Sequence, residues 1–591
     1  MAFHIQFSSL LISTSNFMIS RPRACLAPTS VSRLRSGVAS CPVQCVADIT
    51  RISNDEKIIA RRSANYQPPI WNFDFVQSLQ TQYTRESYAE RFENLKEVVR
   101  EILSNLEDDP LAQLEHIDML QRLGISYHFD EEIKCVLEEI YNNNSKKNND
   151  LYAIALEFRL LRQHGYSMPQ EVFNAFRDEM GNFSADTVAM LSLYEASFHM
   201  IKGESILEEA RDLSIKCLEE YIKTNKVQND VLSLLVSHAL ELPLHWRMPR
   251  LESRWFIDLY ERRHDKNPFL LEFAKLDFNI VQSTHQEDLK HASRWWRNTG
   301  LEKLDFARDR LVENFLWTVG FAYEPQFGYY RRTGTEVIAF ITLIDDIYDV
   351  YGTLDELELF TNAVERWDTD AMDELPDYMK MCFLAFYNSV NDMAFHLLKE
   401  QGIHIIKYLK KGWADLCKGF LVEAKWYYSG YTPTFQEYID NAWISISIPM
   451  ILVHAYLFAA NPTKEALNYL EEYSSIFRHS GILFRLLDDL GTSSNELKRG
   501  DVPKSIQCYM YEARVLEEKA CQDIKLLIHE KWKHVNEERV ADSPFSKTFI
   551  EIAMNVVRTG QFFYQYGDGY AIQDRETKEH IVSLFVDPIP L

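Results

Sequence analysis

The sequence has little positive charge for its length. Its 591 residues include 63 Lys and Arg against 87 Asp and Glu, so the net charge is −24. A general nucleic-acid binder presents a basic field, and this acidic chain is therefore not expected to bind nucleic acid. An anionic ligand would have to be held by a local basic cluster or by metal ions.

Closely spaced cysteines and long apolar runs are also missing. The nine cysteines include no C-x-x-C pair, which argues against a disulfide framework and a zinc site. The longest apolar stretch, 444–460, is interrupted by two serines, a proline and a histidine. It is too short and too broken for a membrane span, so we expect a buried, kinked helix there.

The first 47 residues contain no Asp or Glu. They include nine serines and four arginines. An acid-free leader rich in serine and arginine is typical of an organelle transit peptide. We therefore predict a transit peptide over 1–47.

Strand-like alternation is nearly absent from about residue 52 onward. Apolar residues recur at three- and four-residue spacing, as from Phe92 to Leu106, which predicts an all-α fold. No fixed-period repeat supports a solenoid. The chain is too long for one ordinary core, and the polar segment 262–268 ends in proline. We expect two helical domains, at 48–266 and 267–591.

The sequence DDIYD at 345–349 follows an apolar run. In a helix, Asp345 and Asp349 share one face, while Asp346 lies about 100° round from Asp345. The apolar run would carry these carboxylates inward, where like charges need a cation. Taken alone, the motif could equally be an ordinary acidic helix turn.

A second acidic motif, DDLGTSSNE, occupies 488–496. Asp488, Thr492 and Glu496 would line one helical stripe. Two carboxylates and a hydroxyl suit a Mg²⁺ ion that shares phosphate oxygens. The alternative is a helix end at the Gly-Thr-Ser-Ser-Asn segment. Two such motifs in one domain favour a metal-filled cleft between opposed helices.

Basic residues accompany both motifs. Arg485 stands among Leu and Phe residues three positions before Asp488, so we expect it to face inward. Arg308, Arg310 and Lys504 are further candidates, because Arg binds phosphate bidentately and Lys acts as a point charge. With metal ions, these residues suit a diphosphate.

An RR-x8-W segment runs from Arg61 and Arg62 to Trp71, and its paired prolines make it extended. Together with Arg308-Asp309-Arg310, DDIYD and DDLGTSSNE, it resembles plant class I terpene synthases. More narrowly, the four motifs resemble those of plastidial monoterpene synthases of angiosperms. The resemblance extends from Arg61 to the YQYGDG segment at 564–569.

The resemblance implies a C-terminal class I terpenoid synthase α-bundle and an N-terminal relic α-barrel. It implies a monomer or homodimer in the chloroplast stroma that binds a small prenyl diphosphate. Three Mg²⁺ or Mn²⁺ ions would be held by Asp345, Asp349, Asp488, Thr492 and Glu496. Asp346 would orient its neighbours rather than bind metal.

The resemblance also implies substrate-binding residues. The basic ones are Arg308, Arg310, Arg485 and Lys504, with Arg308 and Arg485 acting in catalysis beside Asp345 and Asp349. Further contacts are expected from Trp317, Ile338 and Tyr564. Arg61, Arg62 and Trp71 would form an N-terminal cap over the site.

The implied chemistry is ionisation of an allylic diphosphate. Metal ions and basic side chains would stabilise the departing anion, and aromatic faces the carbocation. Trp317 and Tyr564 are the preferred wall residues. Tyr348, Phe420 and Trp443 are further candidates, with core packing as the alternative. A helix break at 445–449 would expose backbone acceptors to the cavity.

The product expected from the resemblance is a cyclic monoterpene made from geranyl diphosphate. Arg61 and Arg62 would accompany isomerisation to the linalyl form, since the trans double bond forbids direct ring closure. Ile338 stands where many relatives carry Asn, which favours a hydrocarbon. Alternatives are acyclic or hydroxylated products of the ocimene, myrcene, linalool or terpineol type, or a sesquiterpene from farnesyl diphosphate.

More distant alternatives lack part of this pattern. Isoprenyl-chain elongating synthases usually carry a second DDxxD and are about half as long. A protonation-started class II cyclase would carry an Asp-x-Asp-Asp motif, which is absent here. A non-catalytic helical scaffold that binds diphosphates remains open, and it would release no diphosphate.

Overall fold

The computed structural model describes residues 61–591 except 107–108, 143–149, 179–180, 182, 184, 226–229 and 572–574. The predicted transit peptide lies outside these residues. Within them, the regular structure is helical. No strand is found among the described residues, whose only β-type pairing is an isolated antiparallel bridge between Arg177 and Phe183. This confirms the predicted all-α class.

The N-terminal part begins as an extended segment before its first helix. Its α-helices are α1 (Phe73–Ser78), α2 (Arg85–Ser104), α3 (Pro110–Arg122), α4 (Asp130–Asn142), α5 (Leu151–Gln163), α6 (Thr187–Ser197), α7 (Ser205–Thr224), α8 (Val231–Glu241) and α9 (Pro249–Glu261). Several of these helices begin after an N-cap residue, such as Thr84 or Asp109, whose side-chain oxygen accepts a hydrogen bond from a backbone amide of the first turn.

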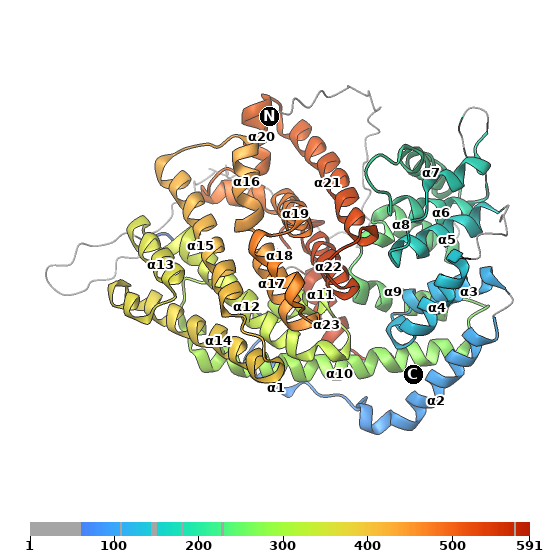
Figure 1. The fold of residues 1–591 in the computed structure, drawn as a ribbon, viewed down its shortest axis with the longest axis horizontal. Helices are drawn as coiled ribbons and strands as arrows, with labels where there is room; N and C mark the ends of the chain where they lie inside the picture. Colours follow the sequence, from blue (N-terminus) through green and yellow to red (C-terminus); the bar gives the residue numbers. More distant parts are fainter. Residues whose placement is uncertain are drawn as a thin grey trace, which may run out of the picture. The chain divides into compact units, whose positions relative to one another are not determined.

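A long helix, α10 (Pro268–Thr299), follows and contacts α2, α11 and α12 (Figure 1). The remaining α-helices are α11 (Leu311–Phe321), α12 (Gly328–Asp346), α13 (Leu354–Arg366), α14 (Asp377–Gln401), α15 (Ile406–Ser429), α16 (Phe435–Ser445), α17 (Ile448–Ala459), α18 (Lys464–Glu472), α19 (Ser475–Arg499), α20 (Ser505–Ala513), α21 (Glu517–Val540), α22 (Lys547–Tyr564) and α23 (Arg575–Phe585).

Short helical turns connect several of these helices. The 3₁₀ turns are η1 (Ser126–His128), η2 (Gln170–Phe176), η3 (Leu244–Trp246), η4 (Leu301–Lys303), η5 (Pro325–Phe327) and η7 (Thr369–Glu374). A π-helical turn, η6 (Ile347–Tyr351), continues α12 directly.

Polar side chains of α10 anchor the end of the chain. Asn279 donates to the carbonyl of Ile589 at 2.8 Å, and Gln286 donates to the carbonyl of Phe585 at 2.9 Å. Both side chains are buried, so these bonds satisfy groups that would otherwise be costly to desolvate. The C-terminal segment is thereby packed onto the same helix that contacts α12.

The N-terminal helices and the later helices pack directly on each other. His245 Nε2 lies 2.8 Å from Asn536 Oδ1, and Arg558 Nε donates to the carbonyl of His245 at 2.7 Å. Residues 262–267 form the turn between α9 and α10. The division into domains at 48–266 and 267–591 stays a prediction.

The stretch predicted to be a kinked helix forms α16 and α17 with a break between them. Ser447 has φ of +70°, and the ring of Pro449 falls in the first turn of α17. By length and composition alone, Phe435–Ala459 could cross a membrane, but 78% of its most apolar window is buried inside the protein. These residues therefore serve as core.

Candidate active site

The first acidic motif spans the junction between α12 and η6. The α-helix ends at Asp346, and the next five residues form a π-helical turn that contains Asp349. The motif was expected on a continuous α-helix, so this local geometry is a correction. Single π-turns inside α-helices occur frequently at functional sites. Asp345 and Asp349 nonetheless line the same cavity.

The second acidic motif lies inside one unbroken helix. α19 continues through Gly491 and ends only at Arg499, where Gly500 adopts a left-handed conformation. The alternative interpretation of this motif as a helix end is therefore wrong. Asp488, Thr492 and Glu496 all line the cavity, as their spacing predicts.

One cavity brings both motifs together with basic and apolar side chains. Its lining comes from the loop before α11 and from α11, α12, η6, α15, the α16–α17 break, α19, the segment before α20, α22 and the residues after it. The predicted residues in this lining are Arg308, Trp317, Ile338, Asp345, Asp349, Phe420, Arg485, Asp488, Thr492, Glu496, Lys504 and Tyr564.

Arg308 is held by the first motif. Its Nη2 donates to Asp345 Oδ2 at 2.5 Å, and its Nε lies 2.9 Å from Asp346 Oδ1. Asp346 is fully buried, whereas Asp345 is partly exposed to the cavity. Asp346 therefore contacts Arg308 and does not line the cavity, and its role in orienting its neighbours stays a prediction.

Arg485 and Lys504 are held by buried acids. Arg485 Nη1 lies 3.0 Å from Asp488 Oδ2 and 3.3 Å from Asp489 Oδ1. Lys504 Nζ lies 3.4 Å from Glu423 Oε2. Although burial opposes the charged form of both basic groups, the surrounding acids and Tyr438 keep the pKa of each well above its usual value.

The cavity carboxylates are crowded and poorly solvated. Burial raises the pKa of Asp488 to about 8 despite its contact with Arg485. Burial and the Asp345 charge raise the pKa of Asp349 well above its usual value, and burial raises that of Glu496. Additional positive charge in the cavity would favour the ionised form of all three.

A divalent metal ion fits this donor set. The Thr492 hydroxyl oxygen and Glu496 Oε2 are buried and have no hydrogen-bond partner within the described part of the chain. Unpartnered buried oxygens are costly, and carboxylate and hydroxyl oxygens are suitable ligands for hard cations such as Mg²⁺. Metal binding would therefore satisfy atoms that the folded protein leaves without partners.

The extended N-terminal segment reaches the first motif. Arg61 pairs with both carboxylate oxygens of Glu356 at 2.8 Å and packs against the rings of Tyr351 and Tyr378. Arg62 donates to the carbonyl of Asp349 at 2.8 Å. The paired arginines are therefore fixed to the turn that carries a cavity carboxylate.

Arg62 also joins this turn to the segment after α19. Its Nη2 lies 2.9 Å from Asp501 Oδ1. Asp501 stands between the second acidic motif and Lys504 in the sequence. One side chain of the N-terminal segment thus connects two parts of the site.

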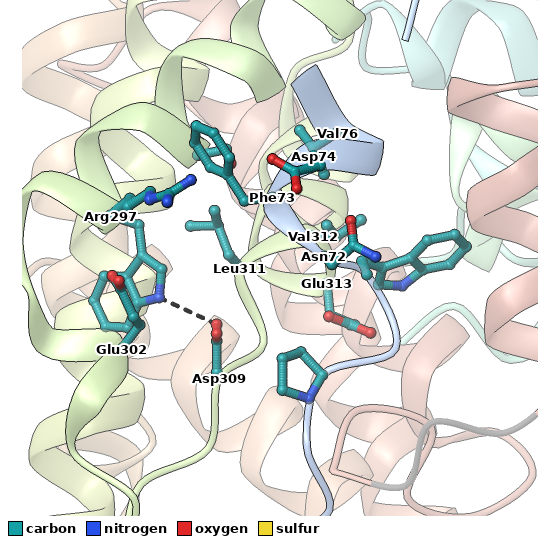
Figure 2. A pocket seen from close by; sticks show the side chains of 14 residues that line it. Asn72, Phe73, Asp74, Val76, Arg297, Glu302, Asp309, Leu311, Val312 and Glu313 are labelled. Atoms are coloured by element: carbon teal, nitrogen blue, oxygen red, sulfur yellow. Dashed lines mark hydrogen bonds between the residues drawn. The ribbon is translucent and has the colours of Figure 1, made fainter. Parts of the chain in front are cut away.

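Trp71 occupies a different pocket, shown in Figure 2. This pocket is lined by residues before and in α1, by the end of α10 and by residues around the start of α11. Among its lining residues, Trp296 Nε1 donates to Asp309 Oδ1 at 3.1 Å. Trp71 therefore lines this pocket and not the active-site cavity.

Aromatic residues contribute to the lining of the cavity. The ring of Trp317 lies 4.0 Å from that of Phe563, 5.5 Å from Phe484 and 6.1 Å from Tyr564, measured between centroids. Ile338 and Phe420 line the same cavity. Aromatic faces stabilise a cation without offering it a nucleophile.

Besides the residues of the predicted cap, three predicted residues lie outside the cavity lining. Arg310 is buried, and its guanidinium group donates to the backbone carbonyls of Gln67 and Ala571, both at 3.2 Å. These hydrogen bonds are made within the protein and not toward the cavity. Tyr348 donates to or accepts from the Thr361 hydroxyl at 2.7 Å. The Trp443 ring packs 5.9 Å from that of Tyr473.

The structure adds residues that the sequence analysis did not identify. Glu423 of α15 lines the cavity and approaches Lys504, and Tyr570 lies within 2.6 Å of the hydroxyl of Thr342. Asp489 is fully buried and accepts a 2.9 Å hydrogen bond from Tyr438. Glu423 has no motif around it, so only the packing of α15 reveals its place.

Family models match both halves of the chain. The terpene synthase N-terminal domain matches residues 70–240, and the terpene synthase metal binding domain matches residues 297–534. The chain therefore belongs to the terpene synthase family. It carries the metal-binding domain of that family, which contains both acidic motifs.

Relatives with named activities extend along nearly the whole chain. A chloroplastic myrcene synthase from Quercus ilex is 61% identical over 570 residues, which cover 95% of each chain. A (−)-alpha-terpineol synthase from Vitis vinifera is 60% identical over 548 residues, covering 91% of this chain and 92% of the relative.

Solved structures agree with the fold. A limonene synthase with 2-fluorolinalyl diphosphate is 44% identical with a TM-score of 0.86, and the match covers 90% of this chain and all of that one. An isoprene synthase from Populus x canescens, in complex with three Mg²⁺ ions and dimethylallyl-S-thiolodiphosphate, is 45% identical with a TM-score of 0.81. That match covers 88% and 99% of the two chains.

These findings confirm several predictions. The class I terpenoid synthase fold, the terpene synthase activity and the lyase class are confirmed by the family and its solved members. The monoterpene synthase class and the chloroplast location are confirmed by relatives that are 57–61% identical. The named relatives make cyclic and acyclic products, so they agree with both product classes considered.

Proposed function

We propose that this monoterpene synthase ionises geranyl diphosphate, isomerises it to the linalyl cation and closes that cation to a cyclic monoterpene, preferentially a hydrocarbon. The carrying observation is one cavity whose lining combines both acidic motifs and basic side chains with the aromatic residues Trp317, Phe484 and Tyr564. An acyclic or hydroxylated monoterpene is the second candidate, favoured by the 61% identical myrcene synthase.

Three Mg²⁺ or Mn²⁺ ions would be held by Asp345, Asp349, Asp488, Thr492 and Glu496. When bound, they would neutralise the departing diphosphate and act as Lewis acids on its oxygens. The unpartnered oxygens of Thr492 and Glu496 support this assignment. The named isoprene synthase complex, with its three Mg²⁺ ions, supports the number.

The basic side chains would bind the diphosphate oxygens and keep them in place after the bond breaks. Arg308, Arg485 and Lys504 line the cavity and are positioned by buried carboxylates, so they need little rearrangement on binding. Arg310 would act indirectly, because it fastens the N-terminal segment to the loop after α22. These charges would stabilise the anion that ionisation produces.

The aromatic lining residues would shield the carbocation from water. Trp317 and Tyr564 line the cavity, and their rings would stabilise positive charge, whereas Ile338 offers no hydrogen bond to a water molecule. The lack of a water anchor at Ile338 favours loss of a proton over hydroxylation. We further propose that residues 48–266 and 267–591 form the N-terminal and catalytic domains.

To test the proposal, the full chain and a form that lacks residues 1–47 are each incubated with geranyl diphosphate and Mg²⁺. Volatile products are identified by gas chromatography and mass spectrometry, and released diphosphate is measured in parallel. We expect mainly a cyclic hydrocarbon. A dominant acyclic product or alcohol would select the second candidate, and no terpene from geranyl, neryl or farnesyl diphosphate would exclude catalysis of this kind.

A further inference from the structure

A carboxylate outside both acidic motifs lines the active-site cavity. Glu423 lies on α15 and is only 4% exposed. Although burial opposes ionisation, the charges of Lys504 and Arg485 and a hydrogen bond from Ser445 keep the pKa of Glu423 below its usual value. Glu423 is therefore ionised in the folded protein, and a buried charge needs fixed partners.

The two oxygens of Glu423 contact two different parts of the chain. Oε1 accepts a hydrogen bond from the hydroxyl of Ser445, the last residue of α16, and another from Asn441 Nδ2 at 3.4 Å. Oε2 lies 3.4 Å from Lys504 Nζ. One carboxylate thus joins the end of α16 to the lysine directly before α20.

The chain forms part of the cavity wall where α16 ends. Ser445, Ile446 and Ser447, which make up the α16–α17 break, all line the cavity. Ser447 has φ of +70°. A non-glycine residue in this left-handed region is strained, and it persists only where its surroundings fix it. The hydrogen bond from Ser445 to Glu423 is one such contact, two residues before the strained position.

α15 and α16 pack on each other (Figure 1), and they approach closely at the end of α16. A Cβ at Gly419, one helical turn before Glu423, would lie 3.2 Å from Ser445 Cβ and 3.3 Å from Ser445 N. Asn441 Nδ2 also donates to the carbonyl of Gly419 at 3.1 Å. The end of α16 therefore contacts the face of α15 that carries Glu423.

The main chain beside Lys504 has its own link to α16. Asp489 is fully buried and accepts hydrogen bonds from the amide of Ser505 at 3.0 Å and from the hydroxyl of Tyr438 in α16 at 2.9 Å. Asp489 thus fixes the backbone next to Lys504, while Glu423 faces the ammonium group. Both the backbone and the side chain of Lys504 are placed relative to α16.

We propose that Glu423 is a positioning residue that fixes the α16–α17 break relative to Lys504 and thereby selects the product. The inference rests on the proposed function, in which Lys504 binds the diphosphate and the cavity wall shapes the carbocation. A wall fixed relative to the diphosphate restricts the conformations in which the cation closes a ring or loses a proton. A tenfold change in product ratio corresponds to a barrier difference of only about 1.4 kcal/mol, so the loss of one charge-assisted hydrogen bond can redirect the reaction.

The test compares the products that the full chain and its variants make from geranyl diphosphate with Mg²⁺, and released diphosphate is measured in parallel. Ser445→Ala removes the hydroxyl that reaches Glu423, and Glu423→Gln removes the charge. Each should lower the share of the main wild-type product at least twofold and raise other monoterpenes. In Ser445→Ala, the KM for geranyl diphosphate and the Mg²⁺ concentration for half-maximal rate should stay unchanged, because both metal-binding motifs are intact.

Two further variants test how the contacts are linked. The double variant of Ser445 and Glu423 should give the product shares of Glu423→Gln alone, since both changes break the same contact. Lys504→Gln should lower turnover, as the proposed function requires, and should also shift the product shares in the direction of Ser445→Ala. Circular dichroism monitors folding, and Ser445→Ala and Lys504→Gln keep the test decisive if Glu423→Gln does not fold.

Matched controls remove groups of the same kind elsewhere. Glu365→Gln breaks an exposed ion pair between a carboxylate and Lys418 of α15. Ser429→Ala removes an exposed α15 hydroxyl that bonds within its own helix. Both controls should keep the wild-type product shares, because neither residue reaches the cavity wall.

The outcomes separate this inference from the proposed function. A wild type that makes no terpene would overturn the proposed function and the inference with it. Normal wild-type turnover with product shares unchanged in Ser445→Ala or in Glu423→Gln would overturn the inference alone. A Lys504→Gln variant that is slower but keeps the wild-type shares would refute the link between the wall and the diphosphate.

Discussion

The backbone amide of Arg308 donates a hydrogen bond to Asp346 Oδ2 at 2.7 Å, and the guanidinium Nε of the same arginine lies 2.9 Å from Asp346 Oδ1. Asp346 is fully buried and absent from the cavity lining, whereas Asp345 and Asp349 belong to it. Adjacent aspartates of one motif thus have different surroundings. Asp346 contacts an arginine, and its neighbours line the cavity.

This difference predicts distinct effects of Asp346→Asn and Asp345→Asn. Asp346→Asn should lower kcat/KM for geranyl diphosphate by about 10- to 100-fold, the usual cost of losing a residue that orients a ligand-binding group. The Mg²⁺ concentration for half-maximal rate should change little. Asp345→Asn should raise that concentration strongly. Diphosphate release is measured across a Mg²⁺ titration, and equal shifts in both variants would contradict the assignment.

Replacing Asp349 should stabilise the metal-free protein and weaken its stabilisation by Mg²⁺. Burial and the Asp345 charge raise its pKa in the folded protein, so its ionised form destabilises the metal-free chain as pH rises above the ordinary carboxyl range. At pH 8, Asp349→Asn should therefore raise the unfolding temperature without Mg²⁺ and abolish the rise that Mg²⁺ causes. Both are read by thermal unfolding with and without EDTA.

An exposed acid supplies the control for this experiment. Asp373→Asn, in a 3₁₀ turn outside the motifs, should leave both the metal-free unfolding temperature and the Mg²⁺ response unchanged. If Asp349→Asn destabilises the metal-free chain, crowding of carboxylates in the cavity is not the dominant effect.

The alignment of the side chains within the second acidic motif could be predicted from sequence because helical spacing determines which side chains share a face. Asp488, Thr492 and Glu496 lie where i, i+4, i+8 spacing places them, and the apolar neighbours of Arg485 correctly indicate its burial. These are local relationships within single helices, and the 3.6-residue period is sufficient for them.

Long-range relationships could not be predicted in this way. Glu423 reaches the cavity through the packing of α15, and no residue spacing in the sequence signals its contact with Lys504. Arg310 was expected at the substrate because it belongs to a basic motif, but backbone carbonyls of two distant segments take its hydrogen bonds. The π-turn after Asp346 likewise has no distinct apolar pattern.

From the ion pair between Arg62 and Asp501 we predict that both residues serve the isomerisation of geranyl diphosphate to the linalyl form. Arg62→Ala should reduce turnover of geranyl diphosphate more than that of linalyl diphosphate, since only the former must isomerise before ring closure. Asp501→Asn should have the same selective effect, because the 2.9 Å ion pair is partly shielded from water. Rates with both substrates are compared for the single and double variants.

If the two residues act together, the double variant should be little worse than either single variant. Arg91→Ala is the control, because it removes an exposed ion pair with Glu272 far from the motifs in sequence. Equal losses with both substrates would show that Arg62 does not serve isomerisation specifically.

Because of the buried Glu336, we expect the protein to lose stability as the pH rises. Burial raises the pKa of this α12 carboxyl to about 8 from its ordinary 4.5. The folded protein therefore holds a proton that the unfolded chain has released, and stability falls as pH rises from about 4.5 to about 8. Glu336→Gln should gain unfolding temperature relative to wild type over this range, with a constant difference above it.

Thermal unfolding at pH 5, 6.5, 8 and 9 measures this difference. Glu472→Gln, which changes an exposed carboxyl of α18, should show a difference that stays constant with pH. A Glu336→Gln difference that is equally flat would mean that the buried carboxyl does not take up a proton on folding.

Gly491 allows α19 to approach α22 within the second acidic motif. A Cβ at this position would lie 2.9 Å from Tyr564 Cβ and 3.0 Å from the carbonyl oxygen of Gly567. Backbone atoms cannot rotate away, so Gly491→Ala should separate the helices, reduce stability by about 1–3 kcal/mol and displace the flanking Asp488 and Thr492. Turnover should fall at least tenfold.

Gly412→Ala is the comparison, because its Cβ would meet the flexible Met450 side chain. It should cost less stability and leave the Mg²⁺ requirement unchanged, and equal losses in both variants would contradict the close approach as the reason for glycine in the motif.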